Sequence, residues 1–141
     1  LWAMRDYARQ MELIAASEQP FEAKLIAAIT SHVSKYREQN GAMKVYHAER
    51  LYLPEEKREE LYRLGSGYRQ DLEQVFTEGQ SAGSVREDVY CHFAAQAVIG
   101  MCNAWGELIA RDPELDLFHV IRKCTDLLNN GFTSKPDNKQ E

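Results

Sequence analysis

The chain has 141 residues, which is enough to bury a sizeable core within one domain. Its composition, 44% hydrophobic and 28% charged, is ordinary for a soluble protein. The formal net charge of −5 leaves no excess of lysine and arginine for binding phosphates, so we expect no DNA binding by this chain alone. No apolar run approaches the roughly 20 residues that a membrane-spanning helix needs, which argues against a membrane partner.

The cysteines and the start of the chain bear on its cellular setting. The three cysteines, Cys91, Cys102 and Cys124, are odd in number and lack CxxC spacing. The first residues do not form the positively charged segment followed by an apolar segment that is typical of a secretion signal. We therefore expect a cytoplasmic protein with no disulfide framework, metal or other cofactor. The chain begins at Leu1, directly in a helical pattern, and we interpret it as a fragment whose missing part lies upstream.

Apolar residues recur at steps of three and four along the whole chain, which is the spacing of amphipathic helices. This pattern predicts an all-α antiparallel bundle of about six helices with short connections. We expect residues 1–132 to form one ligand-binding and dimerisation domain, and the polar residues 133–141 to form a flexible tail. The predicted helices cover about residues 2–16, 21–40, 42–52, 54–79, 87–110 and 114–129.

Glycines and a carboxylate mark the boundaries in the second half. Gly65-Ser66-Gly67 lies inside the predicted helix over 54–79, and we interpret it as a bend or close contact in one continuous helix. Gly79 and Gly83 are expected to end that helix. Asp88 is expected to cap the next one, because its side-chain oxygen can accept from the first unpaired amides.

The predicted helix over 87–110 carries a strip of small residues beside apolar residues at 4-3-4-3 spacing. A glycine inside a helix is destabilising unless something gains from the missing side chain, such as a second backbone approaching closely. The strip either packs on the last helix of the same chain or forms a two-fold interface, in which the last two helices of two copies make a four-helix bundle. The interface residues in the second arrangement are Ala97, Gly100, Ala104, Leu108, Ile121, Cys124 and Leu128.

Patterns typical of enzymes are missing from the sequence. The histidines stand on four different predicted helices without HExxH spacing, and there is no Ser-His-Asp order, nucleophile elbow or phosphate loop. Asp116 and His119 form a single i, i+3 pair, whereas a metal site in a helix bundle needs further carboxylates on neighbouring helices. We therefore expect neither an enzyme nor a metal site.

The middle helices carry more polar-tipped aromatic and flexible side chains than a sealed core needs. Ligand pockets are mostly apolar with a few placed polar groups, so these side chains favour an internal cavity. The alternative is that the tyrosine hydroxyls point outward from the edge of the core. Arg50 can meet an anionic ligand group or pair with Glu49 or Glu56. The candidate ligand-binding residues are Tyr46, His47, Tyr68, Met101, Asn103 and Trp105.

The segment from Phe76 to Trp105 and the ending from Leu128 to Phe132 carry a resemblance to a known family. The order of a helix end with two glycines, a short turn, and a helix with a small-residue face strongly resembles the effector-binding and dimerisation half of TetR-type (tetracycline-repressor-like) transcriptional regulators. The residues that carry it are Phe76, Gly79, Gly83, Val85, Arg86, Asp88, Ile99, Gly100, Met101, Asn103, Trp105, Gly131 and Phe132.

The resemblance implies a homodimer through the last two helices and a small-molecule effector. The apolar lining of the predicted cavity favours a hydrophobic or acyl-type effector over a sugar. The resemblance also implies operator DNA as a partner, reached through an N-terminal helix-turn-helix domain that this chain does not contain. Ligand binding would shift the dimer out of its operator-binding conformation, with the first helix as the lever. The rival interpretation is a ligand-free helical dimerisation or interaction module.

Overall fold

The computed structural model describes residues 2–38, 48–132 and 134, and these residues form five α-helices, one short 3-10 helix and no strand. Within that part of the chain, no helix is both long and apolar enough to cross a membrane. The all-α prediction is confirmed. The elements are α1 (Trp2–Ala16), α2 (Phe21–Glu38), η1 (Arg50–Tyr52), α4 (Glu55–Ser81), α5 (Cys91–Arg111) and α6 (Leu117–Asn130).

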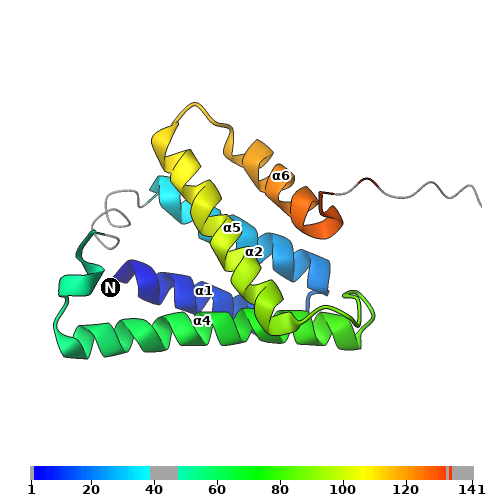
Figure 1. The fold of residues 1–141 in the computed structure, drawn as a ribbon, viewed down its shortest axis with the longest axis horizontal. Coiled ribbons are helices and arrows are strands. Elements are labelled where there is room, and N and C mark those ends of the chain that lie inside the picture. Colours follow the sequence, from blue (N-terminus) through cyan, green and yellow to red (C-terminus); the bar gives the residue numbers. More distant parts are fainter. Residues whose placement is uncertain (1, 39–47, 133, 135–141) are drawn as a thin grey trace, which may run out of the picture.

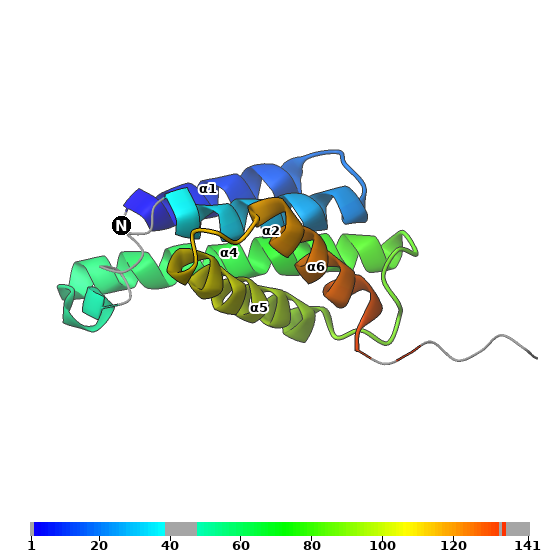
Figure 2. The same ribbon diagram turned by 90° about the horizontal axis from the view of Figure 1, so that it is seen from above.

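Helix α2 is the central element of the bundle. It contacts α1, α4, α5 and α6, while α1 and α4 run side by side along one edge (Figure 1). The view from above shows α6 and α5 on the side away from α1 (Figure 2). This arrangement places side chains from α1, α2, α4 and α5 close to one another in the interior.

The core forms because each helix buries one stripe of apolar residues. In α2 the buried residues Leu25, Ala28, Ile29 and Val33 recur at steps of three, one and four, which keeps them on one face. Burying one Leu, Ile or Val side chain stabilises the fold by about 1.5–3 kcal/mol. The largest fully buried side chains on the other helices are Met11, Leu72, Val75, Cys102, Ile109 and Cys124.

Helix α4 passes through Gly65-Ser66-Gly67 without interruption, as expected, and continues to Ser81. The expectation that Gly79 ends this helix is wrong. A Cβ atom at Gly79 would lie 2.7 Å from the ring of Phe21, so this glycine allows α2 to approach closely. The chain turns instead at Gly83, whose φ of 85° lies in the left-handed region that glycine tolerates best.

The connection between α4 and α5 differs from the expected Asp88 cap. The Asp88 carboxylate pairs with Arg86, and α5 begins at Cys91 without a side-chain cap. The Gln80 side-chain amide holds the turn, because its Nε2 donates to the carbonyl oxygens of Arg86 and Val89, both at 2.9 Å. An amide donor at the end of α4 therefore fixes the turn, and no side chain accepts from the first amides of α5.

A carboxylate cap occurs at the start of α6. This helix begins at Leu117, and the Asp116 Oδ1 accepts from the backbone N–H of Phe118 at 3.1 Å. Asp116 is thus used as a helix cap. Of the predicted helix over 42–52, residues 42–47 lie outside the described residues, and its end forms the 3-10 helix η1.

Candidate functional site

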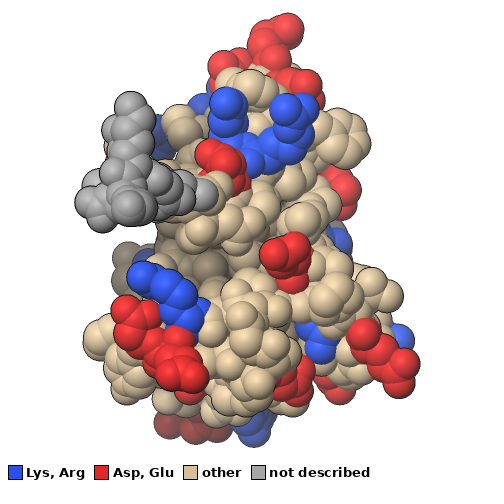
Figure 3. Space-filling view, turned by 90° about the vertical axis from the view of Figure 1, so that its right-hand side faces the viewer, with Lys and Arg blue, Asp and Glu red and all other residues tan. Residues whose placement is uncertain are grey.

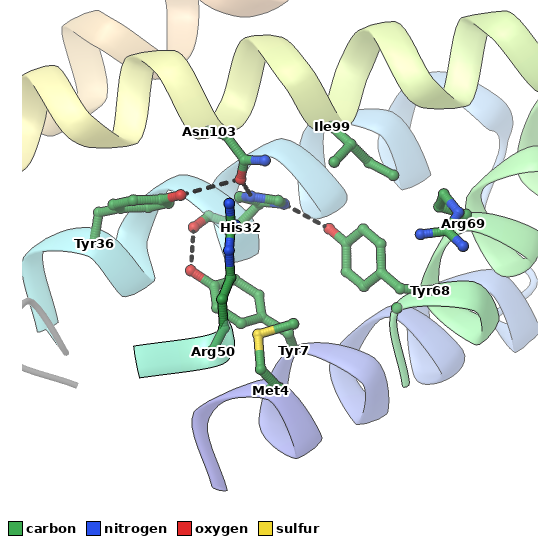
Figure 4. Close-up of a pocket in the computed structure, with 10 residues that line it drawn as sticks. Met4, Tyr7, His32, Tyr36, Arg50, Tyr68, Arg69, Ile99 and Asn103 are labelled. Carbon is green, nitrogen blue, oxygen red and sulfur yellow. Dashed lines mark hydrogen bonds between the residues drawn. The ribbon is translucent and has the colours of Figure 1, made fainter. Parts of the chain in front are cut away.

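A cavity of about 190 Å³ lies among α1, α2, α4, α5 and η1 (Figure 4). It exceeds the space of one or two waters, each of which occupies about 30 Å³ in the liquid, but is smaller than the roughly 300–1,000 Å³ of most ligand pockets. Its lining residues are Met4, Tyr7, His32, Tyr36, Arg50, Gly65, Tyr68, Arg69, Ile99 and Asn103.

His32 is the centre of a hydrogen-bonded cluster in this cavity. Its Nε2 lies 2.7 Å from the Asn103 Oδ1, and its Nδ1 lies 2.9 Å from the Tyr68 hydroxyl. The Tyr36 hydroxyl donates to the same Asn103 oxygen at 3.0 Å. Three helices are thereby tied together through the imidazole ring, since these partners come from α2, α4 and α5 (Figure 4).

The protonation of the cluster follows from its burial. Desolvation lowers the pKa of His32 to about 4, although the hydrogen bond with Asn103 opposes this, so the imidazole is neutral at pH 7. An amide oxygen only accepts, so Nε2 carries the proton and Nδ1 accepts from Tyr68. Burial raises the pKa of the Tyr68 hydroxyl and that of Tyr7, which keeps both groups protonated as donors.

Helix α1 is joined directly to this cluster. The Tyr7 hydroxyl donates to the backbone carbonyl of His32 at 2.9 Å, and the two rings lie 5.1 Å apart. Met4, one turn earlier on α1, also lines the cavity. Two side chains of α1 therefore border the cavity.

Tyr36 is held in place by a glycine on α5. A Cβ atom at Gly106 would lie 2.2 Å from the Tyr36 ring, so only glycine leaves room for the ring. The ring is almost fully buried, and its hydroxyl reaches Asn103 on the same helix as Gly106. Gly106 thus positions one of the two donors to the Asn103 oxygen.

Asn103 also brings a donor to the cavity. Its Oδ1 accepts from His32 and Tyr36, while its Nδ2 has no hydrogen-bond acceptor among the described residues. Figure 4 shows Nδ2 turned toward the side of the cavity where Ile99 and Arg69 lie. This amide group is available to an acceptor atom of a bound molecule.

Of the candidate ligand-binding residues, Tyr68 and Asn103 line the cavity, and Met101 and Trp105 do not. Residues two positions apart on a helix point in nearly opposite directions. Met101 and Trp105 therefore point away from the cavity that Asn103 lines, and they pack against other parts of the core. Tyr46 and His47 lie outside the described residues.

The sequence pattern counted Tyr36 among the polar-tipped aromatics that favour a cavity, but it missed His32, Tyr7 and Met4, because each of these falls on an apolar stripe that looks like core. The signal that was present is the spacing of His32 and Tyr36, two polar-tipped rings one turn apart on an otherwise apolar face.

The candidate dimer residues divide into two groups. Ala97, Gly100, Ala104 and Leu108 share an exposed stripe along α5. Ile121 and Cys124 are buried inside this single chain, with Cys124 fully buried, because α6 turns them toward α2 and α5. They are therefore core residues of one chain, whereas Leu128 is half-buried.

A second cavity of about 540 Å³ lies at the end of the molecule where α4 connects to α5. Figure 3 shows this end as a hollowed surface with many uncharged side chains. Its walls include Phe21, Leu25, Phe76 and Val85, together with Ala97 of the exposed stripe. It is larger than the first cavity but contains no buried polar cluster and no residue of α1, so we regard the first cavity as the candidate site.

Comparisons with known proteins agree with this architecture. Residues 18–127 match the family model of the tetracyclin repressor-like C-terminal domain. Three similar solved structures are the TetR family transcriptional regulator PfmR from Thermus thermophilus (20% identity, TM-score 0.84), the transcriptional regulator FadR from Bacillus subtilis in complex with stearoyl-CoA (22%, 0.75), and a transcriptional regulator of the TetR/AcrR family from Thermobifida fusca (20%, 0.75).

The alignments cover 94%, 92% and 94% of this chain and 72%, 70% and 70% of those chains, in the same order. No curated protein matches the sequence significantly. At these identities the solved structures show a shared fold, and the family match over most of the chain shows descent. The chain therefore belongs to the tetracycline-repressor-like family, as the C-terminal domain of a TetR-type transcriptional regulator.

Proposed function

We propose that this chain is the effector-sensing and dimerisation domain of a TetR-like repressor, in which a small hydrophobic ligand shifts the dimer out of its operator-binding conformation. The observation that carries this proposal is the cavity with its buried His32–Asn103 cluster and the free amide Nδ2 of Asn103. The Bacillus relative was crystallised with stearoyl-CoA, which supports an acyl-type ligand here. Operator DNA would be reached through a helix-turn-helix domain upstream of Leu1, in the cytoplasm.

The ligand signal would leave the cavity through α1. Two charged pairs fix this helix to its neighbours, Arg5 with Glu60 of α4 and Asp6 with Lys35 of α2. A ligand drives a conformational change only by binding one state better than the other. A ligand that displaces Met4 or Tyr7 would favour the state in which α1 has moved, and that difference in affinity would release the operator.

Thermal unfolding with an added ligand tests the effector proposal. A ligand at about a hundred times its Kd should stabilise the fold by about 2.7 kcal/mol, which raises the melting temperature by several degrees. Asn103→Leu should weaken a ligand that accepts from Nδ2 by at least about 2- to 10-fold, because it removes that hydrogen bond and also the acceptor shared by His32 and Tyr36. Met101→Leu on the same helix, outside the cavity, is the matched control and should leave affinity unchanged. Equal affinity for both variants would refute this site.

The dimer proposal rests on the exposed α5 stripe of Ala97, Gly100, Ala104 and Leu108. A Cβ atom at Gly100 meets nothing within 4 Å inside one chain, so the missing side chain has no role within the monomer. Gly100→Leu should overpack a partner helix and give a monomer or an aggregate. Light scattering checks this, and a monomeric unmodified chain at micromolar concentration would refute the dimer.

One observation favours the second candidate function, a ligand-free dimerisation module. The cavity volume of about 190 Å³ lies below the usual range for ligand pockets. If a broad set of apolar and acyl compounds leaves the melting temperature unchanged while the chain remains dimeric, the module is the better description.

A further inference from the structure

The cavity differs in charge from the rest of the chain. The whole chain has a formal net charge of −5, but the ten residues that line the cavity include two arginines, Arg50 and Arg69, and no aspartate or glutamate. His32 contributes no charge at pH 7, because burial lowers its pKa to about 4. The cavity is therefore cationic within an acidic domain.

Neither arginine is neutralised by a neighbour. Among the described residues no carboxylate lies within ion-pair distance of Arg50 or Arg69, although Arg5 and Lys35 pair with acidic residues nearby. The two partners that the sequence suggested for Arg50, Glu49 and Glu56, form no ion pair with it. Residues 39–47, which precede η1, contain no aspartate or glutamate in their sequence. Both guanidinium groups thus have donors to spare for an anion.

The glycine of α4 that lines the cavity belongs to the same arrangement. A Cβ atom at Gly65 would lie 3.5 Å from a guanidinium nitrogen of Arg69, which folds back along its own helix by one turn. That distance is an ordinary van der Waals contact, so the Arg69 guanidinium lies against the wall that Gly65 forms, and alanine would also fit there.

We propose that the ligand of this cavity is an amphiphilic anion, whose carboxylate or phosphate group is held by Arg50 and Arg69 and whose apolar part packs against Met4 and Ile99. This rests on the proposed effector-sensing function and names its ligand class. Arginine suits both head groups, since its planar fork of N–H donors matches carboxylate and phosphate oxygens. Figure 4 shows that the two guanidinium groups and the two apolar side chains border one cavity.

Three probes with one tail and different head groups test the proposal by calorimetric titration: octanoate, octyl phosphate and octanol. At least one of the two anions should bind at least about tenfold more tightly than octanol. A charge-assisted hydrogen bond to an arginine contributes enough free energy for this difference in affinity. The tighter of the two anions identifies the head group as carboxylate or phosphate.

Arg50→Gln and Arg69→Gln should each weaken the preferred anion about tenfold and leave octanol within about twofold. Arg63→Gln is the control, since it removes the same charge from exposed α4 surface outside the cavity. Its affinity should match that of the unmodified chain. Melting temperatures of the variants, measured without probe, confirm that each one folds.

The outcomes separate the two proposals. If octanol binds as tightly as both anions, the anion site is refuted and the effector cavity stands. The anion site is also refuted if Arg63→Gln weakens binding of the anions as much as Arg50→Gln and Arg69→Gln do. The weaker binding would then reflect the net charge of the whole protein and not the two arginines of the cavity. If no probe binds at millimolar concentration, the anion site and the effector cavity are both overturned.

Discussion

Replacing Gly106 with alanine adds one methyl group at the point where α5 meets Tyr36. The new Cβ atom would lie 2.2 Å from one ring carbon and 2.4 Å from the next, whereas unstrained carbon atoms approach to about 3.5–4.0 Å. The ring has no free direction of retreat, because it is only 2% exposed and its hydroxyl donates to Asn103. Either the ring leaves this hydrogen bond or α5 moves away from α2.

Two effects of opposite sign set the magnitude. Overpacking a dense core costs about 1–3 kcal/mol, and this contact lies near the upper end since the ring is confined. Alanine recovers about 1 kcal/mol of helix propensity relative to glycine. The net loss is about 2 kcal/mol in the free energy of unfolding. For a chain near 150 residues this lowers the melting temperature by about 4–8 °C, at about 2–4 °C per kcal/mol.

Circular dichroism during heating measures the change, with Gly67→Ala as the matched control. Gly67 lies inside α4, and a Cβ atom there meets nothing within 4 Å, so that variant gains helix propensity without a clash. Its melting temperature should rise by about 2–4 °C. The reasoning is refuted if Gly106→Ala melts at or above the temperature of the unmodified chain, because Tyr36 would then not be held against α5.

Two further predictions concern titratable groups. The pKa of His32 falls from 6.5 when unfolded to about 4 when folded, so the unfolded chain takes up the proton first. The contribution of His32 to stability is therefore nearly constant above pH 6.5 and declines by about 3 kcal/mol as the pH falls to 4. Urea unfolding of His32→Gln should lack this decline, while exposed His119→Gln should keep it. Separately, hydrogen bonding to Cys124 and burial raise the pKa of Cys102. Cys124 is protected by burial, since its side chain is fully buried between the helices. Ellman's reagent should thus modify only half-buried Cys91 in the folded chain, and rapid reaction of all three thiols would contradict the packing of α5 on α6.

The positions of the helices could be predicted from the sequence, because they depend on neighbouring residues. Two of the residues that line the cavity could be predicted in the same way. The predicted bounds of α1 are correct, because the spacing of apolar residues and the break at residues 17–20 are properties of neighbouring residues. The sequence pattern singles out Asn103 as a polar side chain on an apolar helix and Tyr68 as a polar-tipped ring on the inner stripe of α4; both line the cavity. Met101 and Trp105 share a helix with Asn103 but face away from it.

By itself the sequence determined that this protein is all-helical, where its helices lie and which family it resembles, because helical periodicity and turn residues act over a few positions. Only the tertiary structure decided which residues meet in the cavity. His32 and Asn103 are 71 positions apart, and their hydrogen bond exists because α2 packs across both α4 and α5. The same packing buried Ile121 and Cys124 inside the chain and left Ala97, Gly100 and Ala104 exposed. An apolar stripe shows that a helix has an inner face, but the neighbour that covers this face is set by how all the helices fit together.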